Sequence, residues 1–316
     1  MDQPTGRPAA VSHGVQALLR IGRNTSDLER AIAFHRDAVG FEVIDADAPP
    51  PAWTRLAGVD ARPSRCARLA LGAQEIELTE FRGAAPYPKG STSCDLWFQH
   101  FAVVTADIQT AFQRAVAHGA IPITRDGPQR MPPSTGSVTA FKFRDPDGHP
   151  MELLAFPPGV GDPHWHVGRS GNSPNVGIDH SAISVGEVER SIRFHELLGL
   201  RIAARGVNRG VEQQRLDDLA DVAVDVVAME APARTPHLEL LGYRHPCGRH
   251  RPTAPLTAIA ADRLTWSARG IQVLLEAVVD AGFADAVLGN GLDGGRALAL
   301  LRDPDGHLLL LAAADA

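Results

Sequence analysis

The chain has 316 residues, enough for about two domains that each bury a hydrophobic core. Its 37 acidic and 31 basic side chains give a formal net charge of −6, which argues against nucleic acid as a partner. No apolar run approaches the roughly 20 residues that a membrane span needs, so no membrane partner is expected. The polar start, residues 1–10, lacks a signal peptide's apolar stretch, and the three cysteines are scattered. Both features predict a cytoplasmic protein.

The first half of the chain contains two successive units with the element order β-α-β-β-β. In the first unit we predict a strand at 15–21, a helix from the cap Thr25-Ser26-Asp27 to about Val39, and strands at 41–44, 68–71 and 75–81. In the second unit we predict strands at 98–105 and 121–124 around a helix at 108–117. A hairpin at Asp145-Pro146-Asp147-Gly148 closes this unit, because proline and glycine there preset a tight turn.

The second half repeats this order. A third unit has a strand at 177–185, a helix at 188–198 and a last strand at 237–241, and a fourth has a strand from 264, a helix at 271–281 and a hairpin at Asp303-Pro304-Asp305-Gly306. Pro157 to Val176 hold many Pro, Gly and Asn residues without periodicity, and we interpret them, with His164-Trp165-His166, as a surface linker. We therefore predict an N-terminal domain at 12–157, a linker at 158–175 and a C-terminal domain at 176–316.

Polar residues recur at matching positions on the first and last strands of the units, where side chains alternate between two faces. Aligning the two halves sets three pairs side by side: Glu77 with Glu239, His100 with Arg263, and Glu152 with Leu310. The first strands leave two alignments open, because either Gln16 or Arg20 can stand beside His180.

In the first half this alignment gathers an amide, an imidazole and two carboxylates, a plausible ligand set for a divalent metal. The predicted ligands are Gln16, Glu77, His100 and Glu152, and they suit Zn, Ni, Co, Mn or Fe. The second half has lost a carboxylate at Leu310 and has a cation at Arg263. We expect that half to be a metal-free copy in which Arg263 pairs with Glu239.

These features together resemble the vicinal oxygen chelate superfamily, which includes glyoxalase I, bleomycin-resistance proteins, methylmalonyl-CoA epimerase and extradiol dioxygenases. The resemblance depends on the four units, on the helix end Ala33-Phe34-His35-Arg36-Asp37-Ala38-Val39-Gly40-Phe41, and on Asp-Pro-Asp-Gly-His before the last strand of each half. It implies an α+β fold in which the four βαβββ modules form two glyoxalase-like, cup-shaped mixed-sheet domains. The metal of this family binds on the first and last strands of the units.

Gln16, Glu77, His100 and Glu152 resemble, in type and order, the Gln/Glu/His/Glu set of some glyoxalase I enzymes. The resemblance implies a lyase or isomerase that acts on a small substrate with neighbouring oxygens. The metal would serve as a Lewis acid that stabilises an enediolate. Glu152 or Glu77 would move the proton, and Arg20 is a candidate anchor for an anionic substrate.

Two alternatives remain open from the sequence. An Fe(II) extradiol dioxygenase uses two histidines and one carboxylate, and here Gln16 stands where its first histidine would be. A binding module, like the drug-sequestering members of the superfamily, would lack metal ligands. A small-molecule substrate is the expected partner, and the chain is a monomer or a homodimer. His149 and His307 follow the turn glycines in both halves, including the half without ligands, which indicates a structural role.

Overall fold

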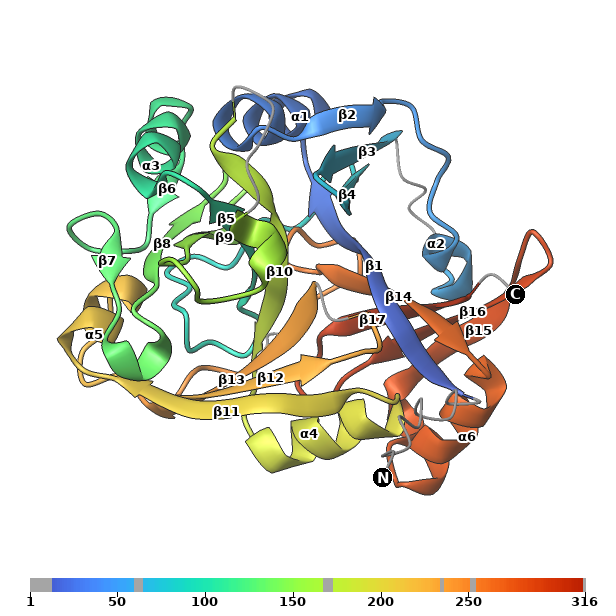
Figure 1. Cartoon of the computed structure of the whole chain (residues 1–316). Coiled ribbons are helices and arrows are strands. Elements are labelled where there is room, and N and C mark those ends of the chain that lie inside the picture. Colours follow the sequence, from blue (N-terminus) through green and yellow to red (C-terminus); the bar gives the residue numbers. More distant parts are fainter. Residues whose placement is uncertain (1–12, 60–64, 167–172, 234–235, 251–253, 315–316) are drawn as a thin grey trace, which may run out of the picture.

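The computed structural model of the protein describes residues 13–59, 65–166, 173–233, 236–250 and 254–314. The polar start of the chain and residues 167–172 of the predicted linker lie outside the described residues. Four units follow one another along the chain, as the sequence predicts, and their strands form two mixed sheets (Figure 1).

Each unit begins with a long strand followed by a helix. Unit 1 contains β1 (Gly14–Thr25), α1 (Leu28–Phe34), β2 (Glu42–Asp45), α2 (Trp53–Leu56), β3 (Arg65–Leu71) and β4 (Gln74–Glu80). Unit 2 contains β5 (Gln99–Thr105), α3 (Ile108–Ala117), β6 (Ile121–Pro122), β7 (Gln129–Arg130), β8 (Thr139–Arg144) and β9 (Pro150–Ala155). Unit 3 contains β10 (Asn175–Ser184), α4 (Val188–Leu197), β11 (Arg201–Arg209), α5 (Val211–Asp217), β12 (Ala223–Glu230) and β13 (His237–His245). Unit 4 contains β14 (Arg263–Arg269), α6 (Ile271–Asp280), β15 (Val287–Asp293), β16 (Arg296–Arg302) and β17 (Leu308–Ala313).

Local sequence signals account for the element ends. Asp27 caps α1 by accepting a hydrogen bond from the backbone N–H of Arg30, and Asp107 caps α3 in the same way. The predicted first helix continues beyond α1 as a π-helical turn, His35–Val39, which Gly40 ends with a left-handed φ of 91°. The two Asp-Pro-Asp-Gly turns form as predicted, and their glycines have positive φ.

The two sheets pair the units in an unexpected way. Units 1 and 4 form an eight-stranded sheet in the order β15-β16-β17-β14-β1-β4-β3-β2. Units 2 and 3 form a nine-stranded sheet in the order β11-β12-β13-β10-β5-β9-β8-β6, with the ninth strand, β7, paired to β8 outside this order. The expectation that residues 12–157 and 176–316 each form a separate cup is therefore wrong. Pairing unit 1 with unit 2 or with unit 4 buries the same apolar faces, so the hydrophobic pattern of the sequence does not distinguish the two arrangements.

The helices cover the sheets in two pairs that also cross the expected boundary. α3 packs against the π-helical turn that follows α1, and α4 packs against α6 (Figure 1). Beneath them, one hydrophobic cluster of buried residues draws on all four units, with Phe34, Phe141, Phe194 and Trp266 among its large side chains. The described part of the chain is thus one packed body.

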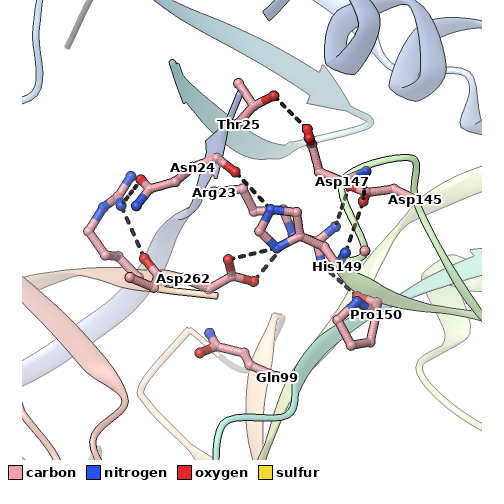
Figure 2. Close-up of polar contacts among 12 residues, drawn as sticks. Arg23, Asn24, Thr25, Gln99, Asp145, Asp147, His149, Pro150 and Asp262 are labelled. Atoms are coloured by element: carbon pink, nitrogen blue, oxygen red, sulfur yellow. Dashed lines mark hydrogen bonds and ion pairs between the residues drawn. The ribbon is translucent and has the colours of Figure 1, made fainter. Parts of the chain in front are cut away.

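The hairpin turns join the two sheets. The buried His149, after the turn in unit 2, lies with Nε2 2.8 Å from the backbone oxygen of Asn24 and with Nδ1 3.0 Å from Asp262 (Figure 2). The buried Arg23 donates to the carbonyl of Pro150 at 2.6 Å. His307 contacts the backbone oxygen of Ser184 at 3.0 Å in the equivalent place. The structural role predicted for both histidines is confirmed.

Another buried histidine, His35, makes the stability of the fold depend on pH. The Nδ1 atom of His35 lies 2.8 Å from the carbonyl oxygen of Ala31, to which a neutral ring donates. Burial lowers the pKa of His35 from 6.5 to about 4, although the charge of Asp145 opposes this shift. The folded state therefore favours the neutral ring. The stability from this preference is full above pH 6.5 and is lost as the pH falls toward 4.

We predict that acid weakens the native protein partly through His35. From pH 7 to pH 4, the free energy of unfolding should fall by about 3 kcal/mol more in the native protein than in His35→Leu, which has no group to protonate there. Urea unfolding of both proteins at the two pH values measures the difference. Equal losses in the two proteins would contradict the assignment.

Candidate metal centre

Two imidazoles and two carboxylates meet on one face of the sheet that units 2 and 3 share. His100 lies on β5, Glu152 on β9, His180 on β10 and Glu239 on β13. In the strand register Ala102 pairs with both Glu152 and His180, and Ala182 pairs with both His100 and Glu239. The four residues therefore occupy neighbouring places on the four central strands of this sheet.

The side chains converge at short range. Nε2 of His100 lies 2.9 Å from Oε2 of Glu152, and Nε2 of His180 lies 3.9 Å from the same oxygen. Nε2 of His180 is also 3.5 Å from Oε2 of Glu239. One ligand atom each of His100, Glu152 and His180 lies within 4.8 Å of the others. These residues are able to hold a metal ion.

The ring of His180 is oriented by a chain of hydrogen bonds. Nδ1 of His180 lies 2.9 Å from Asp179, whose other carboxylate oxygen accepts from the indole N–H of Trp165 at 3.0 Å. A carboxylate on one imidazole nitrogen leaves the other nitrogen free to ligate a metal, and metal-binding histidines commonly have such a partner. Trp165 is buried, so this part of the predicted surface linker supports the site instead.

The site's electrostatics favour a cation. Burial alone would lower the pKa of His180, but the charges of Glu239, Asp179 and Glu152 outweigh it and raise this pKa to about 9. Burial would likewise raise the pKa of Glu239, but His180 and His237 hold it at about 2. The carboxylates thus attract a positive charge, which a proton or a metal ion can supply.

The donor set fits a divalent metal. The buried Nε2 atom of His180 has no hydrogen-bond partner among the described residues, although it faces two carboxylates. An unpartnered buried nitrogen beside carboxylates is costly unless it is protonated or bound to a metal. Nitrogen and carboxylate ligands together suit zinc and other first-row divalent ions.

The structure does not bring the four predicted ligands together. Gln16 and Glu77 belong to the sheet of units 1 and 4, whereas His100 and Glu152 belong to the other sheet. The Nε2 atom of Gln16 donates to the carbonyl oxygens of Gly14 and Val15. Glu77 lies 3.6 Å from Arg263 and 3.5 Å from Arg20.

The corresponding face of the other sheet, which units 1 and 4 form, is a filled copy of the site. Gly22 pairs with Glu77 as Ala182 pairs with Glu239, so Arg20, and not Gln16, corresponds to His180. Arg263 pairs with Glu77, which corrects the expected pairing with Glu239. Arg20 lies 3.4 Å from Glu75 and 3.5 Å from Glu77, so its side chain has carboxylate partners where the sequence suggested a substrate anchor.

The short helix α2, between β2 and β3, covers this face. The guanidinium carbon of Arg263 lies 4.3 Å from the ring centre of Trp53 in α2, which is a cation–π distance. Trp53 also joins Leu310, Phe81, Leu298 and Leu300 in a small buried cluster. The leucine that replaces a carboxylate at position 310 thus contributes to packing.

The proposed metal ligands border a cavity of about 720 Å³. Its wall includes the apolar side chains of Met131, Leu154 and Phe156, and Gly161, Asp162 and Pro163 from the predicted linker. His237, which the sequence interpretation overlooked, also borders it, 3.7 Å from Glu239. The sequence contains one signal for His237, because it lies two residues before Glu239 on a predicted strand.

The comparisons with known proteins agree with this architecture. Residues 17–153 match the family model described as Glyoxalase/Bleomycin resistance protein/Dioxygenase superfamily. Glyoxalase I from Zea mays has a similar structure, with a TM-score of 0.61 and 20% identity over 94% of this chain and 92% of that one. A V278E mutant of this maize enzyme gives a TM-score of 0.63 and 22% identity with the same coverage.

A putative dioxygenase from Bacillus subtilis subsp. subtilis str. 168 is also similar, with a TM-score of 0.58 and 12% identity over 96% of this chain and 86% of that one. No curated protein gives a significant match to the chain. The predicted resemblance is confirmed: residues 17–153 match the model of this superfamily, and the chain shares the fold of glyoxalase I from Zea mays. Among the described residues, no helix is both long and apolar enough to cross a membrane.

We predict that metal content depends on the four residues shared by units 2 and 3. His100→Ala, Glu152→Ala, His180→Ala and Glu239→Ala should each lower the divalent metal retained after dialysis by tenfold or more, since each removes one donor. Gln16→Ala is the matched control and should retain as much metal as the native protein. Elemental analysis of the purified variants measures this, and metal loss in Gln16→Ala would restore the ligand set inferred from sequence.

Proposed function

We propose that the protein is a metal-dependent enzyme of the lyase or isomerase type, acting on a small substrate with neighbouring oxygen atoms. The observation that carries this proposal is the convergence of His100, Glu152, His180 and Glu239 beside a cavity of about 720 Å³. Cavities of this size accommodate small organic molecules. A set with two carboxylates resembles the glyoxalase-type site more than the site of a binding module without metal ligands.

The four side chains would hold a divalent ion such as Zn, Ni, Co, Mn or Fe. When bound, the ion would supply Lewis-acid polarisation of a substrate carbonyl. Asp179 and Trp165 keep the ring of His180 in place, which limits the reorganisation that ligand binding requires. The apolar wall of the cavity displaces water from the substrate and strengthens the electrostatic interactions within it.

Glu239 is the carboxylate best placed to move a proton. Its side chain is 22% exposed, against 8% for Glu152. Glu152 accepts a hydrogen bond from His100 at 2.9 Å, whereas Glu239 lies 3.5 Å from His180 and 3.7 Å from His237. We infer that Glu239 accepts the proton from the carbon next to the substrate carbonyl and returns it to the neighbouring carbon. Glu239 thus takes the role that the sequence assigned to Glu77 or Glu152.

One observation favours a second candidate, the Fe(II) ring-cleaving dioxygenase. The sequence argument against it was the absence of one histidine, and the site now contains both His100 and His180. Together with Glu152 they form a group of two imidazoles and one carboxylate, which is typical of non-haem Fe(II) oxygenases. Glu239 argues against this candidate, because a fourth protein ligand leaves fewer positions for oxygen and a catechol.

We predict that Glu239→Gln slows proton transfer by a factor of about 100 or more, because the neutral amide cannot accept the proton. The metal-loaded protein is incubated in deuterium oxide with a panel of α-hydroxyketones and hemithioacetals, and deuterium uptake next to the carbonyl is followed by NMR. Glu230→Gln, a change on the same cavity wall outside the proposed ligands, should exchange at the native rate.

The remaining outcomes separate the candidates. Oxygen uptake with catechols after anaerobic iron loading, without deuterium exchange, would favour the dioxygenase. A native protein that binds no stoichiometric divalent metal would contradict both enzymes. Exchange at the native rate in Glu239→Gln would contradict the role of Glu239 alone.

A further inference from the structure

A buried lysine borders the cavity beside the proposed metal ligands. Lys142 on β8 lies opposite Glu152 on β9 in an antiparallel pair, so both side chains project from the same face of the sheet. Lys142 is only 4% exposed, yet it borders the cavity together with Glu152 and Glu239. A buried ammonium is costly to maintain, so its surroundings indicate what it does.

The surroundings of Lys142 come from another unit. Its Nζ atom donates to Oδ1 of Asp217 at 2.7 Å, at the end of α5. The other oxygen of Asp217 accepts from Gln213 at 2.7 Å and from the hydroxyl of Tyr243 at 3.0 Å. Asp217 therefore accepts three hydrogen bonds, and its carboxylate faces the ammonium group of Lys142 directly.

Lys142 has hydrogen-bonding capacity that the described residues do not use. An ammonium group has three N–H donors, and among the described residues Asp217 is the one hydrogen-bond acceptor of Nζ. An ion pair that served only to attach α5 to the sheet would not need to border the cavity. The backbone also makes that attachment, through the carbonyl of Leu216, which accepts from Thr124 at 3.0 Å.

The next positions along these strands are apolar. Ala140 lies opposite Leu154, two residues from Lys142 and Glu152 and on the same face. Both belong to a hydrophobic cluster with Met131 and Leu216, against which Val138 and Phe156 pack. The cavity therefore has the ammonium group of Lys142 next to the proposed metal centre and an extended apolar wall beyond it.

We propose that Lys142 is a substrate-binding residue that donates to a carboxylate or other anionic oxygen, so that the substrate is a small organic anion with an apolar body. The anionic oxygen lies at Nζ, the neighbouring oxygens face the ligands His100, Glu152, His180 and Glu239, and the apolar body covers Ala140 and Leu154. This inference rests on the proposed function, because it places the substrate beside the metal. It replaces Arg20 with Lys142 as the anchor for an anionic group.

The test compares an acid with its uncharged ester. Isothermal titration measures the binding of 4-methyl-2-oxopentanoate and of its methyl ester to the Co²⁺-loaded protein. The dissociation constant of the ester divided by that of the acid reports the selectivity for the anion. The apolar contacts, which both probes make, cancel in this ratio. In Lys142→Gln this ratio should fall about tenfold, because a hydrogen bond to a charged group is lost.

Asp217→Asn is the matched variant with the opposite expected effect. It keeps the ammonium but removes its counter-charge, so the selectivity for the anion should rise. If Lys142 and Asp217 only attached α5 to the sheet, both substitutions would change the ratio in the same direction. An unchanged ratio in Asp217→Asn, or in a folded Lys142→Gln, overturns the assignment, and Asp217→Asn decides if Lys142→Gln does not fold.

The two proposals fail in different ways. If the native protein does not take up Co²⁺ stoichiometrically, the proposed function fails at the loading step. If it takes up Co²⁺ and binds acid and ester with ratios that the variants do not change, only the role of Lys142 fails.

Discussion

The antiparallel pairing of β5 with β10 is the contact on which the site depends. It places the first strands of units 2 and 3 side by side, and their last strands flank them. His100 and His180 therefore meet Glu152 and Glu239 across four neighbouring strands. The alternative pairing, within each half of the chain, would have left His100 and Glu152 on one sheet and His180 and Glu239 on the other.

The sequence predicted the four units, most helix ends and the strand positions that carry polar side chains. Those features follow from local periodicity, capping and turn chemistry, which a single sequence displays. It did not predict which units share a sheet, because that choice depends on long-range packing of equally apolar faces. His100 and Glu152 were found, since their own unit brings them together. Their partners His180 and Glu239 were assigned to a metal-free copy.

The corresponding faces of the two sheets balance the charge of their carboxylates in two different ways. On the face of units 1 and 4, Arg263 lies between Glu77 and the ring of Trp53, and the charge is balanced within the protein. On the face of units 2 and 3, Glu152 and Glu239 lie beside the imidazoles of His100 and His180, while the nearby Lys142 pairs with Asp217. The guanidinium that pairs with Glu77 closes one site, whereas the imidazoles beside Glu152 and Glu239 leave the other able to hold a metal ion.

The central claim is the place of the metal, and anomalous X-ray scattering from crystals grown with Zn²⁺ or Co²⁺ tests it most directly. Our account predicts one strong peak in contact with His100, Glu152, His180 and Glu239. It predicts no peak beside Glu77, where Arg263 already supplies the positive charge. A peak at Glu77 with none between His100 and His180 would contradict the account.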